Sequence, residues 1–258
     1  MMEKKYKLTE ETINVDGRTL YRIEALKDFN DVKKGDKGGF IENEKNLSQS
    51  GDCWVYGNAK VSDNAMVCGN AKVYGNARVY CNALVCGNAM VSVNALLIDK
   101  ARVYGNAQVR GNAVVYDNAE ISGDAKIFGN AQIRCDAVVC EDAKIYGHAI
   151  VCGNADVYGN ARIYGNAEVS GNAQVFGNTE IRGDAVITSK SDYILFKNWW
   201  SSGRFFTWTR SNNMWKVGCF YGTGEELIEK AYKDSEMSGE EYERVVKYVD
   251  AILKANKL

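Results

Sequence analysis

Proline is absent from this chain of 258 residues, and histidine occurs only once. A proline within a hydrogen-bonded strand removes a backbone donor, so its absence favours an uninterrupted backbone ladder. A single histidine cannot supply a three-histidine zinc site. We therefore expect neither a metal site nor a cofactor.

Long apolar runs, an excess of charge of one sign and paired cysteine motifs are also missing. The 32 basic residues balance the 33 acidic ones, and no apolar run is long enough to span a membrane. The eight cysteines form no C-x-x-C pair, which favours free thiols in a reducing compartment. We expect a soluble, cytoplasmic protein, in a bacterium or a phage-infected bacterium, that has no membrane partner.

What the chain does contain is a six-residue repeat that runs without insertion from Val55 to Val186. Position one of each hexad is Val, Ile or Leu, position five is Ala except at Thr179, and Gly-Asn dominates positions three and four. A period of two then places Ala and the aliphatic residue on the inner side of a short strand. Gly and Asn tolerate positive φ, so each pair predicts a sharp corner.

If each turn holds three hexads, the coils are triangular, have 18 residues and stack their strands in parallel, about seven to eight coils in all; the alternation alone fixes neither this number nor the handedness. We expect Ala and Val to fill the narrow core, and Asn side chains to stack at the corners. Asp63, Asp99 and Asp117 share one edge of this prism, either as paired acids or a cation site or, as we prefer, as replacements for the corner residues.

The phrase V-Y-G-N-A-R-V-Y resembles the hexapeptide-repeat superfamily. The resemblance implies a left-handed parallel β-helix, commonly trimeric, and many members are acyltransferases that use a histidine as general base. The one histidine here, His148, replaces a corner Asn, where we expect positive φ to be tolerated. We favour this structural role over a catalytic one, because the uninterrupted hexads leave no loop to fold over an acyl carrier.

The outward residues differ between the three faces of the predicted prism. The first face is basic and aromatic, whereas the second and third are too apolar to be solvated. We therefore expect a homotrimer that buries the edge between the second and third faces. The expected interface residues are Met66, Cys68, Leu84, Cys86, Leu96, Ile98, Val114, Tyr116, Val138 and Ile150.

The sequence divides into three predicted parts. Residues 1–42 form an N-terminal cap with a β-hairpin at Asp16-Gly17, and residues 43–192 form the β-helix. Residues 193–258 form a C-terminal α+β domain that contains a hairpin and two helices. Thr223 and Ser238 are the predicted helix caps, and the fold class is mainly β.

The C-terminal domain begins with a stretch that is rich in aromatic residues and has basic but no acidic residues. Aromatic rings beside cations suit a base and a phosphate, so this stretch is the best candidate for ligand binding. The alternative is a hydrophobic plug that closes the coil. The candidate ligand-binding residues are Trp199, Trp200, Arg204, Trp208, Arg210, Trp215 and Lys216.

The segment Leu20-Tyr21-Arg22-Ile23-Glu24-Ala25-Leu26 followed by G-N-A hexads resembles a group of phage or prophage hexapeptide proteins. We interpret the chain as a non-enzymatic homotrimeric binding or scaffold protein with an accessory, anti-defence role. Its expected ligand is a nucleotide-like anion or a host protein, and nucleic acid is disfavoured. The alternatives are a hexapeptide-repeat acyltransferase and a structural, polymer-forming scaffold.

Overall fold

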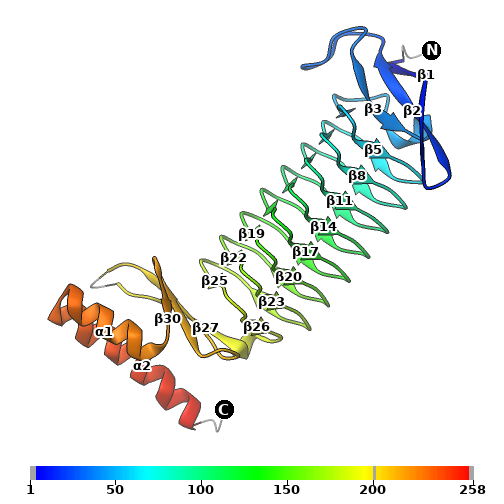
Figure 1. The fold of residues 1–258 in the computed structure, drawn as a ribbon. Coiled ribbons are helices and arrows are strands. Elements are labelled where there is room, and N and C mark those ends of the chain that lie inside the picture. The colour runs from blue at the N-terminus through cyan, green and yellow to red at the C-terminus, as the bar shows by residue number, and fades with distance from the viewer. Residues whose placement is uncertain (1–3, 200–201, 256–258) are drawn as a thin grey trace.

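The computed structural model describes residues 4–199 and 202–255. A long parallel β-solenoid of about eight turns forms a rod between a small N-terminal sheet and a C-terminal unit of four strands and two helices (Figure 1). The predicted mainly-β fold is confirmed. No helix within the described residues combines the length and the apolar character needed to cross a membrane.

The solenoid strands pair in parallel with a constant offset of 18 residues, as the pairs Lys60↔Arg78 and Lys126↔Lys144 illustrate. Three hexads per coil are therefore confirmed. The first face comprises β4 (Trp54–Val55), β7 (Lys72–Val73), β10 (Met90–Val91), β13 (Gln108–Val109), β16 (Lys126–Ile127), β19 (Lys144–Ile145), β22 (Arg162–Ile163) and β25 (Glu180–Ile181).

The other two faces follow the same register. The second face comprises β5 (Lys60–Val61), β8 (Arg78–Val79), β11 (Leu96–Leu97), β14 (Val114–Val115), β17 (Gln132–Ile133), β20 (Ile150–Val151), β23 (Glu168–Val169) and β26 (Val186–Ile187). The third face comprises β6 (Met66–Val67), β9 (Leu84–Val85), β12 (Arg102–Val103), β15 (Glu120–Ile121), β18 (Val138–Val139), β21 (Asp156–Val157) and β24 (Gln174–Val175).

The solenoid core consists of the predicted Ala and aliphatic positions, which are buried in every coil. Thr179, the one exception to Ala, is also buried, and its hydroxyl donates to the carbonyl of Phe176 at 2.7 Å. A buried hydroxyl costs little when it is bonded in this way. The aliphatic side chains supply the main driving force for coil stacking, because each removes apolar surface from water.

Only the third residue of each hexad takes positive φ, so the corner is formed by one residue and not by the predicted pair. The fifteen Gly residues there do so, and so do the seven residues that replace Gly. Among these replacements, Asp63 and Asp117 accept the backbone N–H of the next corner, Cys81 at 3.1 Å and Cys135 at 3.0 Å. Asp on this edge therefore replaces the corner Gly, as preferred, and its carboxylate also caps the coil that follows.

The fourth residue does not take positive φ, so the expectation of positive φ for Asn was wrong. Its role is the predicted side-chain ladder. Asn70 Nδ2 donates to Asn88 Oδ1 at 3.1 Å, and Asn88 Nδ2 donates to Asn106 Oδ1 at 3.0 Å. Amide groups suit this position because each carries both a donor and an acceptor.

The N-terminal sheet extends the second face. Strands β1 (Tyr6–Val15) and β2 (Arg18–Ala25) form the predicted hairpin, with positive φ at Asp16 and Gly17. Strand β3 (Lys37–Ile41) pairs antiparallel with β2 and parallel with β5, and the 3-10 turn η1 (Glu44–Asn46) follows. The sheet therefore occupies the strand edge that the first coil would otherwise leave open.

The C-terminal unit starts after the 3-10 turn η2 (Lys190–Asp192). It comprises β27 (Tyr193–Lys197), β28 (Phe205–Thr209), β29 (Met214–Val217), β30 (Phe220–Gly222), α1 (Gly224–Asp234) and α2 (Glu236–Ala255). Thr223 caps α1 with Glu226, as predicted. The predicted Ser238 cap was wrong, because α2 already begins at Glu236 and the Ser238 N–H donates to Ser235 Oγ at 3.1 Å.

Candidate ligand-binding site

The C-terminal sheet is joined to the last coils by hydrogen bonds from both sides. Tyr193 Oη donates to the Gln174 carbonyl at 3.0 Å, and Tyr221 Oη donates to the Arg182 carbonyl at 3.2 Å. The backbone N–H of Val186 donates to Ser211 Oγ at 2.7 Å. These bonds fix the sheet at the end of the rod and bring its residues beside the first face.

Trp208 and Trp215 lie inside the C-terminal unit rather than on its surface. The two are cross-strand partners in β28 and β29, and each is only 2% exposed. They pack with Phe206, Leu227 and Val246, and Trp208 Nε1 donates to Asn213 Oδ1 at 2.8 Å. Burial leaves neither ring a face for a ligand, so the structure assigns both to the hydrophobic core.

Lys216 forms a joint between the C-terminal sheet and the rod. It is 8% exposed, and its Nζ lies 3.1 Å from a carboxylate oxygen of Glu180 on β25 and donates to the carbonyl of Gly218. Tyr164 Oη donates to the same carboxylate at 3.0 Å. Because the lysine is already paired and bonded, it holds the two parts together instead of facing a ligand.

The other predicted ligand residues lie apart from one another. Trp199 is 79% exposed, and the Lys197 ammonium lies 6.0 Å from its ring centroid. Arg210 is half-buried in a turn where its backbone N–H donates to the Asp192 carbonyl at 2.8 Å. Trp200 lies outside the described residues. The seven residues therefore do not form one cluster.

Arg204 is the predicted residue that the structure places in a pocket. The cavity, of about 240 Å³, lies between the rod and the C-terminal sheet and is lined by Asn160, Arg162, Asn178, Glu180, Arg204, Phe205 and Gly218. Gly218 has a φ of 54°, and a Cβ there would lie 3.3 Å from Cδ of Arg204. The arginine side chain therefore packs closely against this turn, where a side chain on residue 218 would crowd it.

The charge of this pocket is positive. Within the described part of the chain, Arg204 forms no ion pair, and Arg162 reaches the shared carboxylate of Glu180 only at 3.7 Å. Lys216 lies closer to that carboxylate, at 3.1 Å. Two guanidinium groups and two asparagine amides therefore face one space with a single acid among them, an arrangement that suits an oxyanion.

The first face leads directly into this pocket. Phe128, Tyr146 and Tyr164 stack with ring centroids 4.8 Å apart, and Arg182 lies over Tyr164 at 5.6 Å. Beside this aromatic column, Lys144 pairs in register with Arg162. The basic and aromatic face predicted from the sequence therefore meets the Arg204 pocket at its C-terminal end, where Arg162 lines both.

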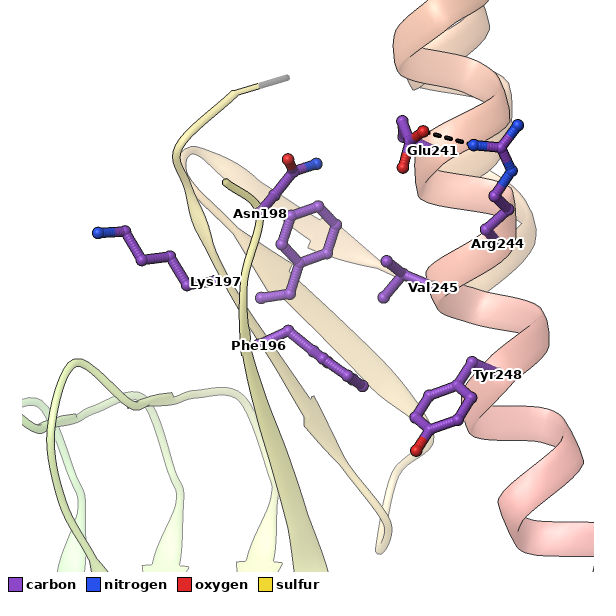
Figure 2. Close-up of a pocket in the computed structure, with 8 residues that line it drawn as sticks. Phe196, Lys197, Asn198, Glu241, Arg244, Val245 and Tyr248 are labelled. Atoms are coloured by element: carbon purple, nitrogen blue, oxygen red, sulfur yellow. Dashed lines mark hydrogen bonds and ion pairs between the residues drawn. The ribbon is translucent and has the colours of Figure 1, made fainter. Parts of the chain in front are cut away.

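A second cavity, of about 450 Å³, lies between the C-terminal sheet and α2 (Figure 2). Phe196, Val245 and Tyr248 point into it, and the rings of Phe196 and Tyr248 meet edge to face at 5.9 Å. Figure 2 shows Lys197 pointing away from this space, while Arg244 is held by Glu241. Apolar side chains point into this cavity and its arginine is paired with an acid, so it does not share the chemistry of the Arg204 pocket.

His148 lies on the exposed edge between the first and second faces. Its Nε2 is 3.5 Å from Asn130 Nδ2, so the ring joins the corner ladder in place of an amide. Gly147, not His148, takes positive φ, so our conformational reason for a histidine here was wrong. Within the described residues, no three side chains of the His, Cys, Asp and Glu types gather as a metal site requires.

The expected interface residues form partly exposed columns on two faces of the rod. Leu96 lies in register with Val114 on the second face, and Met66 with Leu84 on the third. On the second face, Arg134 Nε is buried and has no hydrogen-bond partner among the described residues. Polar residues interrupt both columns, since Gln132 lies between Val114 and Ile150, and Arg102 and Glu120 lie between Leu84 and Val138.

The repeat also identifies the kind of solenoid. Residues 71–87 and 161–177 match the family model described as YdcK Beta solenoid repeat. The chain is 38% identical over 79 residues to a protein of Escherichia coli (strain K12) named "Uncharacterized acetyltransferase YdcK". That match covers 25% of this chain, which spans only about a quarter (24%) of the relative. The hexapeptide-type repeat is thus confirmed, as is its parallel solenoid fold.

Proposed function

We propose that this protein is a non-enzymatic binding protein, a homotrimeric rod that binds a small nucleotide-like anion where the solenoid meets the C-terminal sheet. The observation that carries the proposal is the meeting of Arg162 and Arg204 in one pocket with Asn160 and Asn178. Guanidinium groups bind phosphate through paired hydrogen bonds, and the amides add further donors.

The aromatic surroundings favour a nucleotide over a simple inorganic anion. Phe205 lines the pocket, and the Lys197 ammonium lies 5.6 Å from its ring centroid. The centroid of the exposed Trp199 ring lies 6.0 Å from the same ammonium. A base can stack on an exposed aromatic ring while its phosphate is neutralised nearby, and such stacking contributes about 1–3 kcal/mol per base.

The homotrimer in this proposal rests on the apolar columns of the second and third faces. Apolar side chains gathered on a protein surface mark interaction sites, and the two columns of identical subunits can cover one another around a threefold axis. Sequestration of a nucleotide fits the anti-defence role that the phage-type resemblance implies, with a host protein as the other candidate partner.

Arg204→Ala is expected to weaken nucleotide binding by about 10- to 100-fold, because a charge-assisted hydrogen bond contributes about 1.5–3 kcal/mol. Titration calorimetry with a panel of mono-, di- and cyclic nucleotides measures the loss. Arg102→Ala is the matched control, since Arg102 lies on the third face and pairs with Glu120 at 2.9 Å. The proposal fails if no nucleotide releases heat, or if the two variants behave alike.

The acetyltransferase name of the relative raises a second candidate function. Because this chain covers a quarter of that relative, the name alone does not transfer an activity. His148→Ala is expected to leave acetyl-CoA consumption at the wild-type background, as is Asn130→Ala in the same corner column. A wild-type turnover that falls by about 10²–10⁴ only in the histidine variant would instead favour a general base.

The third interpretation, a polymer-forming scaffold, is disfavoured by the two ends of the rod. Strand β3 covers the first coil, and the C-terminal sheet is bonded to the last coils. Open strand edges are what allow solenoids to stack end to end. With both ends covered, the rod is suited to form a discrete assembly.

A further inference from the structure

A buried lysine and a buried cysteine meet beneath the N-terminal sheet. Lys5 is only 1% exposed and Cys53 is fully buried. Lys5 Nζ lies 3.3 Å from Cys53 Sγ, and it donates to the carbonyls of Cys53 at 2.9 Å and Gly51 at 3.1 Å. Lysine is almost never fully buried unless it is paired, so this contact calls for an explanation.

The surroundings favour the neutral forms of both groups. Burial lowers the pKa of Lys5, although the nearby cysteine opposes the shift, and burial raises the pKa of Cys53. A neutral lysine amine carries a lone pair and is a nucleophile. It is held at a distance from sulfur that is typical of reacting atoms before a bond forms.

A cavity lies against the lysine side of this pair. It has a volume of about 710 Å³ and is lined in part by Lys5, Phe29, Gln49 and Gly51. Gln49 Nε2 is buried and has no hydrogen-bond partner within the described residues. An unsatisfied donor beside the cavity can bind a small polar molecule such as a peroxide.

We propose that Lys5 and Cys53 form a reversible redox cross-link, in which the lysine amine captures the oxidised cysteine as a sulfur–nitrogen bond. In the first step a peroxide transfers one oxygen to sulfur: the O–O bond breaks, an S–O bond forms, the thiol becomes a sulfenic acid and water leaves. Sulfur is oxidised by two electrons and the peroxide is reduced by two.

In the second step the amine nitrogen of Lys5 attacks this sulfur. The S–N bond forms as the S–O bond breaks, and the hydroxide leaves as water with a proton from the amine. Two equivalents of an external thiol reverse the reaction, because they restore the cysteine and the lysine and leave as a disulfide. The cross-link ties the residue just before β1 to the start of the solenoid across 48 residues of sequence and therefore stabilises the cap.

Peptide mapping after treatment with hydrogen peroxide tests the proposal. We expect a linked peptide pair that contains Lys5 and Cys53, has lost two hydrogens and disappears with dithiothreitol. The yield should rise with pH as the amine loses its proton. Cys219, which is exposed, serves as an internal control that oxidises further without a link to lysine. Unmodified Cys53, or Cys53 oxidised to sulfinic acid beside free Lys5, would overturn the proposal.

Lys5→Arg separates the covalent role from a structural one. The guanidinium keeps the positive charge and its donors but stays protonated, so it cannot attack sulfur. In this variant we expect no cross-link, and a sulfenic acid at Cys53 that dimedone traps. The thermal midpoint of the wild type should rise on oxidation and return on reduction, whereas that of the variant should not. A rise of equal size in both proteins contradicts the proposal, and the pH series on the wild type requires no variant to fold.

Discussion

Deletion of one hexad, residues 118–123, is expected to abolish the proposed homotrimer, whereas deletion of one whole coil, residues 118–135, is expected to preserve it. Both deletions keep the phase of the six-residue repeat, so the inner Ala and aliphatic positions stay inside. Only the whole-coil deletion also keeps the offset of 18 residues that aligns each face.

After the hexad deletion, every later residue moves on by one face. Val138 passes from the third face to the second, and Ile150 passes from the second to the first. The cations Lys126 and Lys144 move from the first face onto the third, in line with Met66 and Leu84. Loss of two buried aliphatic side chains costs about 1.5–3 kcal/mol each, and the intruding charges oppose assembly further.

Light scattering after gel filtration distinguishes the outcomes, with far-ultraviolet circular dichroism as the check that both proteins keep β structure. We expect the dissociation constant of the hexad deletion to rise by at least about 100-fold, which gives a monomer at micromolar concentration. A wild type that is itself monomeric refutes the homotrimer. Two trimeric deletion variants would show that the columns do not form the interface.

The solenoid could be predicted almost completely, because the residues of each hexad determine its strand and its corner locally. Val at position one and Ala at position five have one inner surface to share, and the repeat leaves no other way to bury them. The corner was predicted less well. Gly and Asn both tolerate positive φ, so composition could not decide between them. Contact with the coil below decides it, since a side chain on the third residue meets the next corner, as the Asp63 contact with Cys81 illustrates.

The candidate site could be predicted only in part, for a different reason. Aromatic residues beside basic ones mark both a recognition surface and a core beneath amphipathic helices. Trp208 and Trp215 belong to the core because α1 and α2 fold back over β28 and β29, and no local pattern in the tryptophan segment states that. Arg204 and Arg162 line the same pocket only because the C-terminal sheet packs against the end of the rod. That packing is a tertiary contact between residues that are distant in sequence.

The same limit applies at the N-terminal end. Lys5 and Cys53 lie in segments that the repeat does not govern, and their contact arises because β1 packs against the first turn of the solenoid. A lone lysine and a lone cysteine carry no signal in a sequence. Burial shifts the pKa values of both residues, and this burial depends on how the whole N-terminal sheet packs on the first coil.

Glu180→Leu is expected to destabilise the C-terminal unit by about 3 kcal/mol, the lower end of the cost of breaking a buried ion pair. The carboxylate pairs with Lys216, which is nearly buried, and also accepts from Tyr164 Oη. Its removal leaves the ammonium inside the joint without a counter-charge. Urea denaturation followed by tryptophan fluorescence measures the change, because Trp208 and Trp215 lie in the core of this unit.

The double variant Glu180→Leu with Lys216→Met is expected to recover most of that loss, since it removes both charges from the joint. Glu229→Ala is the surface control: Glu229 pairs with Lys233 in the open on α1, so its loss should leave the urea midpoint nearly unchanged. A Glu180 variant as stable as the surface control, or a double variant worse than both singles, contradicts a role for this ion pair.

The same substitution also separates stability from ligand binding. Glu180 is the one acid that lines the pocket of Arg162 and Arg204. Without it both guanidinium groups are free for an anion, so Glu180→Leu should bind the nucleotide more tightly, by about 10-fold, while it unfolds at lower urea. Binding that weakens in step with stability would instead mean that the carboxylate orients the arginines. The joint that holds the C-terminal sheet on the rod would then also set the geometry of the site.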